Sequence, residues 1–295
     1  MTSAAPRGGG GLGATTNFSK LRDQSRRELA ECIDKVRGAK ALVLDPSLSG
    51  PLGLVAEKQL LKEHGVEKTY HLRAEPLETD QRAMVFVVRD SIVNMKAIAA
   101  QVRYDQARRH SVQYLVCLVP RRTIICERVL EEEAVYKHLV LTDLHLGLIP
   151  LEDDVLSMEI PDAYRQATGR GDKSALVDTA RALRRLEALF GVIPVIKGKG
   201  ALAKSVADML LRMRREPAPA TRATAGGGGE GEDAGGASVW GAGGEEEGSP
   251  RIDELILIDR CCDMVTPMLS QLTYQGLIDD LYGINNGVYL CNIHI

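Results

Sequence analysis

Short apolar runs recur through the first part of the chain, and each is followed by charged residues or by proline. The runs at 40–44 (KALVL), 84–88 (MVFVV) and 112–119 (VQYLVCLV) are rich in Val and Leu, and a more polar run lies at 68–72. Continuous apolar runs of this length are typical of strands that are buried on both faces of a sheet. The pattern therefore predicts a strand at each of these four places.

Amphipathic segments separate the runs. Leu21, Leu29 and Ile33 share one side of a helix that we expect at 19–36, with Ser19 as its N-cap. Further helices are expected at 51–63 and 91–102. Strands that alternate with helices are typical of an α/β fold, here a doubly wound parallel sheet that forms a first domain at 18–145.

Charged side chains follow three of the predicted strands directly. Asp45 and Arg89 come after the strands at 40–44 and 84–88, and Arg121 and Arg122 come shortly after the strand that ends at 119. Because parallel strands present their carboxyl ends at one edge of the sheet, we expect these four residues to share that edge. They either solvate the loop ends or form a rim of mixed charge that binds a partner protein, and we take them as candidate partner-binding residues.

A second α/β segment is expected at 146–295. Ser174 is the expected N-cap of a helix in which Leu176, Ala180 and Leu183 begin an apolar stripe, and a second stripe starts at Leu202. The run at 255–258 predicts one more strand. We expect an incomplete second α/β domain here.

Two segments have the composition of disordered chain. Residues 1–17 are rich in Gly, Ala and Thr, and residues 217–250 are rich in Gly, Ala and Glu with few apolar side chains. Segments of this kind bury too little apolar surface to offset the entropy lost on ordering. We expect a disordered tail at the start and a disordered insertion within the second domain.

The charge balance and the cysteine usage narrow the class of protein. The chain has 37 Lys and Arg against 40 Asp and Glu, a net charge of -3, which does not favour nucleic acid as a partner. No apolar run approaches the length that spans a bilayer, and the six cysteines show no regular framework. We therefore expect a cytoplasmic chain with protein partners.

A phosphate-binding loop is the strongest catalytic hypothesis. Residues 198–205 match GxxxxGK[ST] from Gly198 to Lys204 and Ser205, except that Ala203 replaces the second glycine, and Asp259 follows a strand where a magnesium ligand would lie. The alanine hinders a backbone that must wrap around phosphates, and the apolar stripe from Leu202 places Lys204 inside a helix. Nucleotide binding through these residues is kept as the alternative function.

No other catalytic or cofactor signal is found in the sequence. The six histidines are scattered without a zinc-ligand pattern, and the acidic runs lack the spacing of a calcium loop. We therefore expect no cofactor, no metal and no enzymatic activity.

Several strings are too specific to be generic. They are LVLDPSLSGPLGLVAEKQLLKEHGVEK at 42–68, VPRRTIICERVLEEE at 119–133, PLEDDVLSME at 150–159 and LIDRCCDMVTPMLSQLTYQGLIDDLYGI at 257–284. Together they resemble the SM (Sec/Munc) family, and within it the vacuolar protein sorting class C branch of the HOPS and CORVET tethering complexes. The most specific part is Asp-Arg-x-x-Asp-x-x-Thr-Pro, here Asp259, Arg260, Asp263, Thr266 and Pro267.

The resemblance implies a protein that binds syntaxin-type SNAREs in vesicle tethering and fusion. It implies recruitment to endosomal and vacuolar or lysosomal membranes by a helical subunit of the class C core. It also implies a structural role for the Asp-Arg-x-x-Asp segment, in which Asp259 and Arg260 pair and hold the Thr266–Pro267 turn.

The length of the chain departs from the family pattern. Family members are considerably longer, and after Gly287 the sequence no longer resembles the family. We therefore expect a C-terminally truncated member that retains the first domain and its rim.

Overall fold

Five parallel strands form the central sheet of the computed structural model, which describes residues 18–216 and 252–284. The strands are β1 (Lys40–Leu44), β2 (Val66–His71), β3 (Ala83–Arg89), β4 (Gln113–Val119) and β5 (Leu139–Asp143), in the order β2-β1-β3-β4-β5. The order changes direction between β1 and β3, as in doubly wound folds. The fold class predicted from the apolar runs is confirmed, whereas the expected disorder at 1–17 and 217–250 lies outside the described residues.

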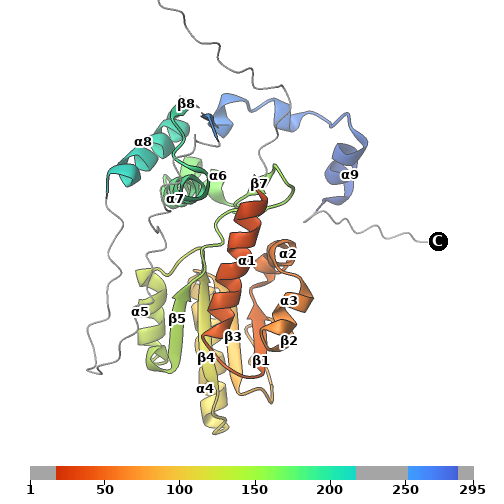
Figure 1. Ribbon diagram of the computed structural model, residues 1–295, viewed down its shortest axis with the longest axis vertical. Helices are drawn as coiled ribbons and strands as arrows, with labels where there is room; N and C mark the ends of the chain where they lie inside the picture. Colours follow the sequence, from red (N-terminus) through yellow and green to blue (C-terminus); the bar gives the residue numbers. More distant parts are fainter. Residues whose placement is uncertain (1–17, 217–251, 285–295) are drawn as a thin grey trace, which may run out of the picture.

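Helices cover both faces of this sheet (Figure 1). They are α1 (Ser19–Asp34), α2 (Pro46–Val55), α3 (Lys58–Glu63), α4 (Ile92–Ala107) and α5 (Ile124–Glu132). Alternate residues of a strand point to opposite faces, so that Val85 and Val87 pack with α1, α2 and α3 while Met84 and Phe86 pack with α4 and α5. The result is two apolar cores, one on each side of the sheet.

Three local predictions were wrong. The helix expected at 51–63 is two helices, because Ala56 and Glu57 have extended backbone between α2 and α3. The N-cap of α1 is Phe18 and not Ser19, which is the first helical residue. The Phe18 ring lies edge-on to the Phe190 ring, with 5.7 Å between the ring centroids. The N-cap of α7 (Ser174–Phe190) is Lys173 and not Ser174, which is the first helical residue. The Asp172 carboxylate accepts hydrogen bonds from the Ser174 backbone N–H at 2.9 Å and from the Ser174 hydroxyl at 2.7 Å.

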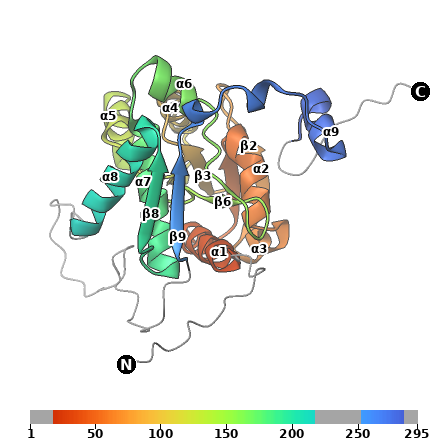
Figure 2. The ribbon, with the colours of Figure 1, turned by 90° about the horizontal axis from the view of Figure 1, so that it is seen from above.

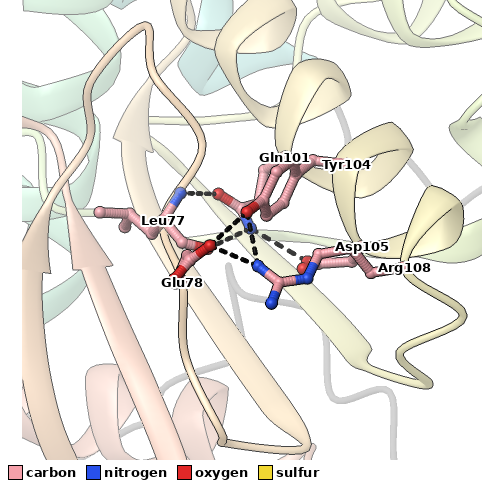
Figure 3. Close-up of polar contacts among 6 residues, drawn as sticks. All are labelled: Leu77, Glu78, Gln101, Tyr104, Asp105 and Arg108. Atoms are coloured by element: carbon pink, nitrogen blue, oxygen red, sulfur yellow. Dashed lines mark hydrogen bonds and ion pairs between the residues drawn. The ribbon is translucent and has the colours of Figure 1, made fainter.

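A buried polar network attaches the loop between β2 and β3 to helix α4 (Figure 3). The Gln101 amide accepts the backbone N–H of Leu77 at 2.6 Å and donates to the Leu77 carbonyl at 3.0 Å and to the Asp105 carboxylate at 3.0 Å. Beside it, the Tyr104 hydroxyl donates to Glu78 at 2.7 Å. Gln101 and Asp105 are buried, and their hydrogen bonds offset the cost of that burial.

The second part of the chain lies at one end of the sheet, where α6, α7 and α8 form a separate layer (Figures 1 and 2). Its elements are β6 (Ile149–Pro150), β7 (Leu156–Ser157), α6 (Ala163–Gly169), α7, β8 (Val195–Lys199), α8 (Ala201–Arg215), β9 (Glu254–Ile258) and α9 (Tyr274–Tyr282). Two short 3-10 helices, η2 (Arg260–Cys262) and η3 (Thr266–Met268), follow β9, and a third, η1 (Tyr136–His138), lies in the first part between α5 and β5. Strands β8 and β9 pair in parallel as a two-stranded sheet, and the boundary predicted at 145/146 stays a prediction.

The two-stranded sheet packs on α7 and α8 with one face. Leu255 and Leu257 contact the apolar cluster between these helices, while Ile256 and Ile258 on the other face are 62% and 70% exposed. Within the described residues, no helix has the length and apolar character needed to cross a membrane.

A buried ion pair joins α7 to α8. The Glu187 side chain has no solvent exposure, and its carboxylate accepts hydrogen bonds from Arg214 on α8 and from the Ile193 backbone N–H at 3.3 Å. The Arg214 guanidinium also donates to the Ile193 carbonyl at 2.9 Å. Arg214 thus attaches the chain that leaves α7 and, with Arg184 at 3.6 Å, neutralises the buried carboxylate.

Contacts between charged groups also connect α7 to the central sheet. The Arg121 guanidinium, just beyond β4, donates to the Asp178 carboxylate at 3.4 Å. Asp90, which follows β3, lies nearby, and burial together with the negative charge of Asp178 raises the pKa of Asp90 to about 6. An ionised Asp90 is therefore an electrostatic cost at neutral pH.

Replacing Arg214 is expected to destabilise the second layer. The change Arg214→Met removes the main cation that faces a fully buried carboxylate, and breaking such a pair costs about 3 kcal/mol. Urea unfolding followed by circular dichroism measures the free energy of unfolding. Arg212→Met, at an exposed position of the same helix, is the control, and equal midpoints for the two variants would show that the pair contributes no stability.

Neutralising Asp90 is expected to stabilise the protein in a pH-dependent way. Because its folded pKa lies above the ordinary value of 3.8, the folded chain takes up a proton near pH 6 that the unfolded chain takes up only at lower pH. Asp90→Asn should therefore add about 1 kcal/mol at pH 7.5 after allowance for solvent screening, and the gain should disappear towards pH 4. Thermal unfolding midpoints at both pH values check this, with the exposed Asp208→Asn as control; a gain independent of pH contradicts it.

Candidate functional site at the carboxyl edge of the sheet

The predicted rim residues lie at the carboxyl ends of β1, β3 and β4, as their positions after parallel strands require. Asp45 is buried and is the N-cap of α2, where it accepts the Ser47 backbone N–H at 2.9 Å. Its other oxygen accepts the Arg89 backbone N–H at 3.2 Å and the Asn94 amide at 2.7 Å. Burial favours the neutral acid, but the hydrogen bonds from Ser47, Asn94 and Arg89 outweigh it and lower the pKa of Asp45.

Two of the rim arginines are engaged within the chain. The Arg89 guanidinium donates to the Glu159 carbonyl at 2.8 Å, and the Arg121 guanidinium donates to Asp178. Glu159 and Asp178 belong to the second part of the chain. Asp45, Arg89 and Arg121 therefore position the edge and join it to the next layer, which the sequence alone did not indicate.

Arg122 is the rim residue that faces solvent. Its guanidinium lies 2.8 Å from the Glu127 carboxylate on α5, and its backbone N–H donates to the Asp143 carboxylate at the end of β5. The Arg122 side chain is 36% exposed, about as much as that of Arg121 at 35%, but its ion pair lies within the first part of the chain.

Exposed aliphatic side chains at the same edge were not predicted. They are the first two residues of α4 and of α5, with exposed fractions of 49% for Ile92, 77% for Val93, 68% for Ile124 and 61% for Ile125. We call these four the aliphatic helix starts. A signal was available, since each pair follows a capping residue, Ser91 or Thr123, so that the outward face of the first turn carries β-branched side chains.

The nucleotide-binding alternative is not supported. The Asp259 carboxylate accepts the Leu202 backbone N–H at 3.0 Å in the first turn of α8 and the Cys261 backbone N–H at 3.0 Å. A Cβ atom at Gly200 would lie 2.2 Å from the Asp259 Cβ, which shows how closely the acid approaches the loop. Asp259 thus occupies the helix start at which a phosphate would bind.

The remaining residues of that motif have helical roles. Lys204 lies within α8, where its backbone N–H donates to the Gly200 carbonyl at 3.1 Å, as its apolar neighbours predicted. The Ser205 hydroxyl donates to the Ala201 carbonyl at 3.0 Å, and Gly198 lies in strand β8. Lys204 and Ser205 therefore lie within a helix and not in a loop that wraps around a phosphate.

The Asp-Arg-x-x-Asp segment holds its turn in a different way from the one expected. No ion pair between Asp259 and Arg260 is present in the described chain; the Arg260 guanidinium donates to the Asp263 carbonyl. The Asp263 carboxylate accepts the backbone N–H groups of Val265 and Thr266, each at 3.0 Å, and the Thr266 hydroxyl. Pro267 follows within η3, so that the second acid of the motif, and not the acid–base pair, holds the Thr-Pro turn.

No group of three or more His, Cys, Asp or Glu side chains is arranged to hold a metal ion in the part of the chain that the structure describes. The arrangement at the edge is one of exposed aliphatic and basic side chains on a rigid sheet. Such a surface binds another macromolecule better than it performs acid–base chemistry.

Comparison with curated proteins gives relatives with vacuolar protein sorting names. The chain is 39% identical over 274 residues to "Vacuolar protein-sorting-associated protein 33 homolog" of Arabidopsis thaliana, covering 93% of this chain and 42% of the relative. It is 38% identical over 272 residues to "Vacuolar protein sorting-associated protein 33A" of Rattus norvegicus, covering 92% of this chain and 42% of that protein. The chain therefore spans about two fifths of the length of these relatives.

Solved structures of SM proteins share the fold. The "SM Protein Vps45 in Complex with Qa SNARE Tlg2" matches with a TM-score of 0.56 and 17% identity, over 90% of this chain and 44% of that one. The "Unc18-syntaxin 1 complex from Monosiga brevicollis" matches with a TM-score of 0.59 and 16% identity, over 86% of this chain and 42% of that one.

The model of the Sec1 family matches residues 40–293. This match extends beyond Gly287, where the resemblance was expected to end, and it includes the sheet, the carboxyl edge and the Asp-Arg-x-x-Asp segment. The chain therefore belongs to the Sec1 family.

Proposed function

We propose that this chain binds syntaxin-type SNARE proteins and acts in vesicle tethering and fusion at endosomes and at the vacuole or lysosome. The names of its relatives support the trafficking route, and two solved proteins of the same fold are complexes with a Qa SNARE and with syntaxin 1. In the proposal, residues 18–145 form the domain that carries the binding surface. The chain performs no catalysis and needs no cofactor.

The observation that carries the proposal is the exposure of the aliphatic helix starts beside Arg122. SNARE segments associate through apolar stripes of helices, and a helix with such a stripe buries it against exposed aliphatic side chains. Arg122 supplies a cation at the border of that contact, where charge selects the partner. Asp45, Arg89 and Arg121 support the same contact by holding the edge in place.

The proposal includes two further elements. A helical subunit of the class C tethering core recruits the chain, and the chain lies on endosomal or vacuolar membranes through its partners. In the proposal, the chain makes its SNARE contact while it is bound to that core.

Charged substitutions at the aliphatic helix starts are expected to weaken SNARE binding. The double change Val93→Asp and Ile124→Asp replaces exposed side chains, so the fold should persist, and it should raise the dissociation constant for a cytosolic syntaxin-type fragment at least about tenfold. Titration calorimetry measures the constant, and Val192→Asp, at a residue 52% exposed after α7, is the control. Unchanged binding by the double variant refutes this surface, and absence of binding by the unmodified chain to every syntaxin-type fragment refutes the function.

Charge reversal at Arg122 tests the rim separately. Arg122→Glu places a second acid beside Glu127 and removes the cation, so binding to the same fragment should weaken about fivefold, with a smaller loss at high salt. Arg128→Glu, at an exposed position of the neighbouring helix α5, makes the same change in net charge and serves as control. If both variants lose affinity equally, Arg122 makes no specific contact.

A further inference from the structure

A cavity of about 340 Å³ lies between the carboxyl edge of the sheet and helix α7. The sheet side contributes Arg121 and Arg122 after β4 and Asp143 at the end of β5, and helix α7 contributes Arg181 and Arg185. These arginines come from segments about 60 residues apart, and they converge only because α7 packs on this end of the sheet (Figure 1).

The lining carries an excess of positive charge. Four arginines face two carboxylates, Asp143 and Asp178, and burial lowers the pKa of His145, which therefore adds little charge at neutral pH. Asp178 is shared, because it lies 3.4 Å from Arg121 and 3.8 Å from Arg181. Two of the arginines pair with acids outside the lining, Arg122 with Glu127 and Arg185 with Glu28, so the excess of positive charge is confined to the lining residues themselves.

Two guanidinium nitrogens of lining residues make no hydrogen bond among the described residues, although one of them, Arg181 Nη1, lies 3.8 Å from the Asp178 carboxylate. They are the Nη1 atoms of Arg181 and Arg185, and both are buried. The Arg185 side chain is only 11% exposed; its Nη2 donates to Glu28 at 2.9 Å, whereas its Nη1 is left without a hydrogen bond. A buried charged donor without an acceptor is costly, so its persistence indicates a site that an acceptor completes.

The spacing of the two arginines adds to this indication. Arg181 and Arg185 are four residues apart on α7 and therefore lie on one face of the helix. Ala182, which also lines the cavity, leaves room between that face and the sheet edge. The planar fork of a guanidinium matches the oxygens of a phosphate, and two forks on one face suit a group with three terminal oxygens.

We propose that this cavity binds the phosphate monoester group of a small molecule or of a lipid headgroup. The group would accept hydrogen bonds from the free Nη1 atoms of Arg181 and Arg185, with Arg121 and Arg122 on the opposite wall. The volume exceeds that of one phosphate, and Met158 and Pro120 provide apolar surface for the adjoining organic part. The cavity shares Arg122 with the surface proposed for the partner but includes none of the aliphatic helix starts, so the inference does not rest on the proposed function.

Calorimetry and thermal unfolding of the full chain test the inference with inorganic phosphate and glycerol 3-phosphate as probes. Both should bind and raise the unfolding midpoint, while chloride at equal ionic strength should not. Arg181→Gln removes the guanidinium and its charge while keeping a polar side chain, and it should weaken binding at least about tenfold. Arg165→Gln removes the same charge from α6, at a side chain 64% exposed, and should bind as the unmodified chain does.

A second variant changes affinity in the opposite direction. Asp178→Asn removes the carboxylate that competes for Arg121 and Arg181, so phosphate binding should tighten about threefold or more. This result keeps the test decisive even if Arg181→Gln lowers stability. Absence of binding by both probes and by phosphatidate vesicles, or equal affinity of all variants, overturns the proposal.

The source of the phosphate is decided by comparing glycerol 3-phosphate with phosphatidylcholine vesicles that contain phosphatidate. Binding of glycerol 3-phosphate alone supports a soluble ligand. Co-sedimentation with phosphatidate vesicles that is lost in Arg181→Gln but kept in Arg165→Gln supports a lipid headgroup. Co-sedimentation that is identical in both variants, without binding of the soluble probes, overturns the cavity as the site.

Discussion

All five strands of the central sheet run in the same direction, so every strand delivers the loop that follows it to one edge. This constraint brings Asp45, Arg89 and Arg122 together although they are far apart in sequence. It also places the N-termini of α4 and α5 at that edge, where the aliphatic helix starts are exposed. The second layer packs on the same edge through Arg89 and Arg121. The edge is therefore both a joint between layers and the surface proposed for the partner.

Two places in the molecule show how differently potential anion sites are used. At the start of α8, the Asp259 carboxylate accepts the Leu202 N–H, so the chain supplies its own anion and the helix end is satisfied. In the cavity beside α7, four arginines share the lining with two acids, and the buried Nη1 atoms of Arg181 and Arg185 make no hydrogen bond among the described residues. Residues 198–205, which resemble a phosphate-binding loop, thus form a helix start whose N–H group is already hydrogen-bonded within the chain. The arginines of the cavity, in contrast, do not form a short sequence motif.

Membership of the Sec1 family agrees with this division of roles. The Asp-Arg-x-x-Asp segment is most specific in sequence, yet in the structure its acids cap backbone N–H groups: Asp259 at α8 and Cys261, and Asp263 at the Thr266 turn. These hydrogen bonds give the acids of the motif a role in holding the local backbone geometry. The surfaces proposed for partners lie elsewhere and consist of residue types that no pattern search selects, namely exposed Ile and Val and ordinary arginines.

The sequence by itself determined the parallel sheet. Strands that are buried on both faces need continuous apolar runs, and the loops that connect them need polar residues. It missed β5, whose side chains are mostly half-buried or exposed at the edge of the sheet, so that its apolar run is short. It also assigned the N-caps of α1 and α7 to Ser19 and Ser174, which are the first helical residues. The Phe18–Phe190 contact and the hydrogen bond to the Asp172 carboxylate lie at these two helix ends.

Only the tertiary structure decided what the charged residues of the edge do. Strand-end position predicts that Arg89 and Arg121 share an edge, but the Glu159 carbonyl and Asp178, which hold them, come from the second part of the chain. The cavity likewise needs Arg121 and Arg122 from one segment and Arg181 and Arg185 from another. Apolar patterning is local and readable along the chain, whereas the partner of a charge depends on which distant segment packs against it.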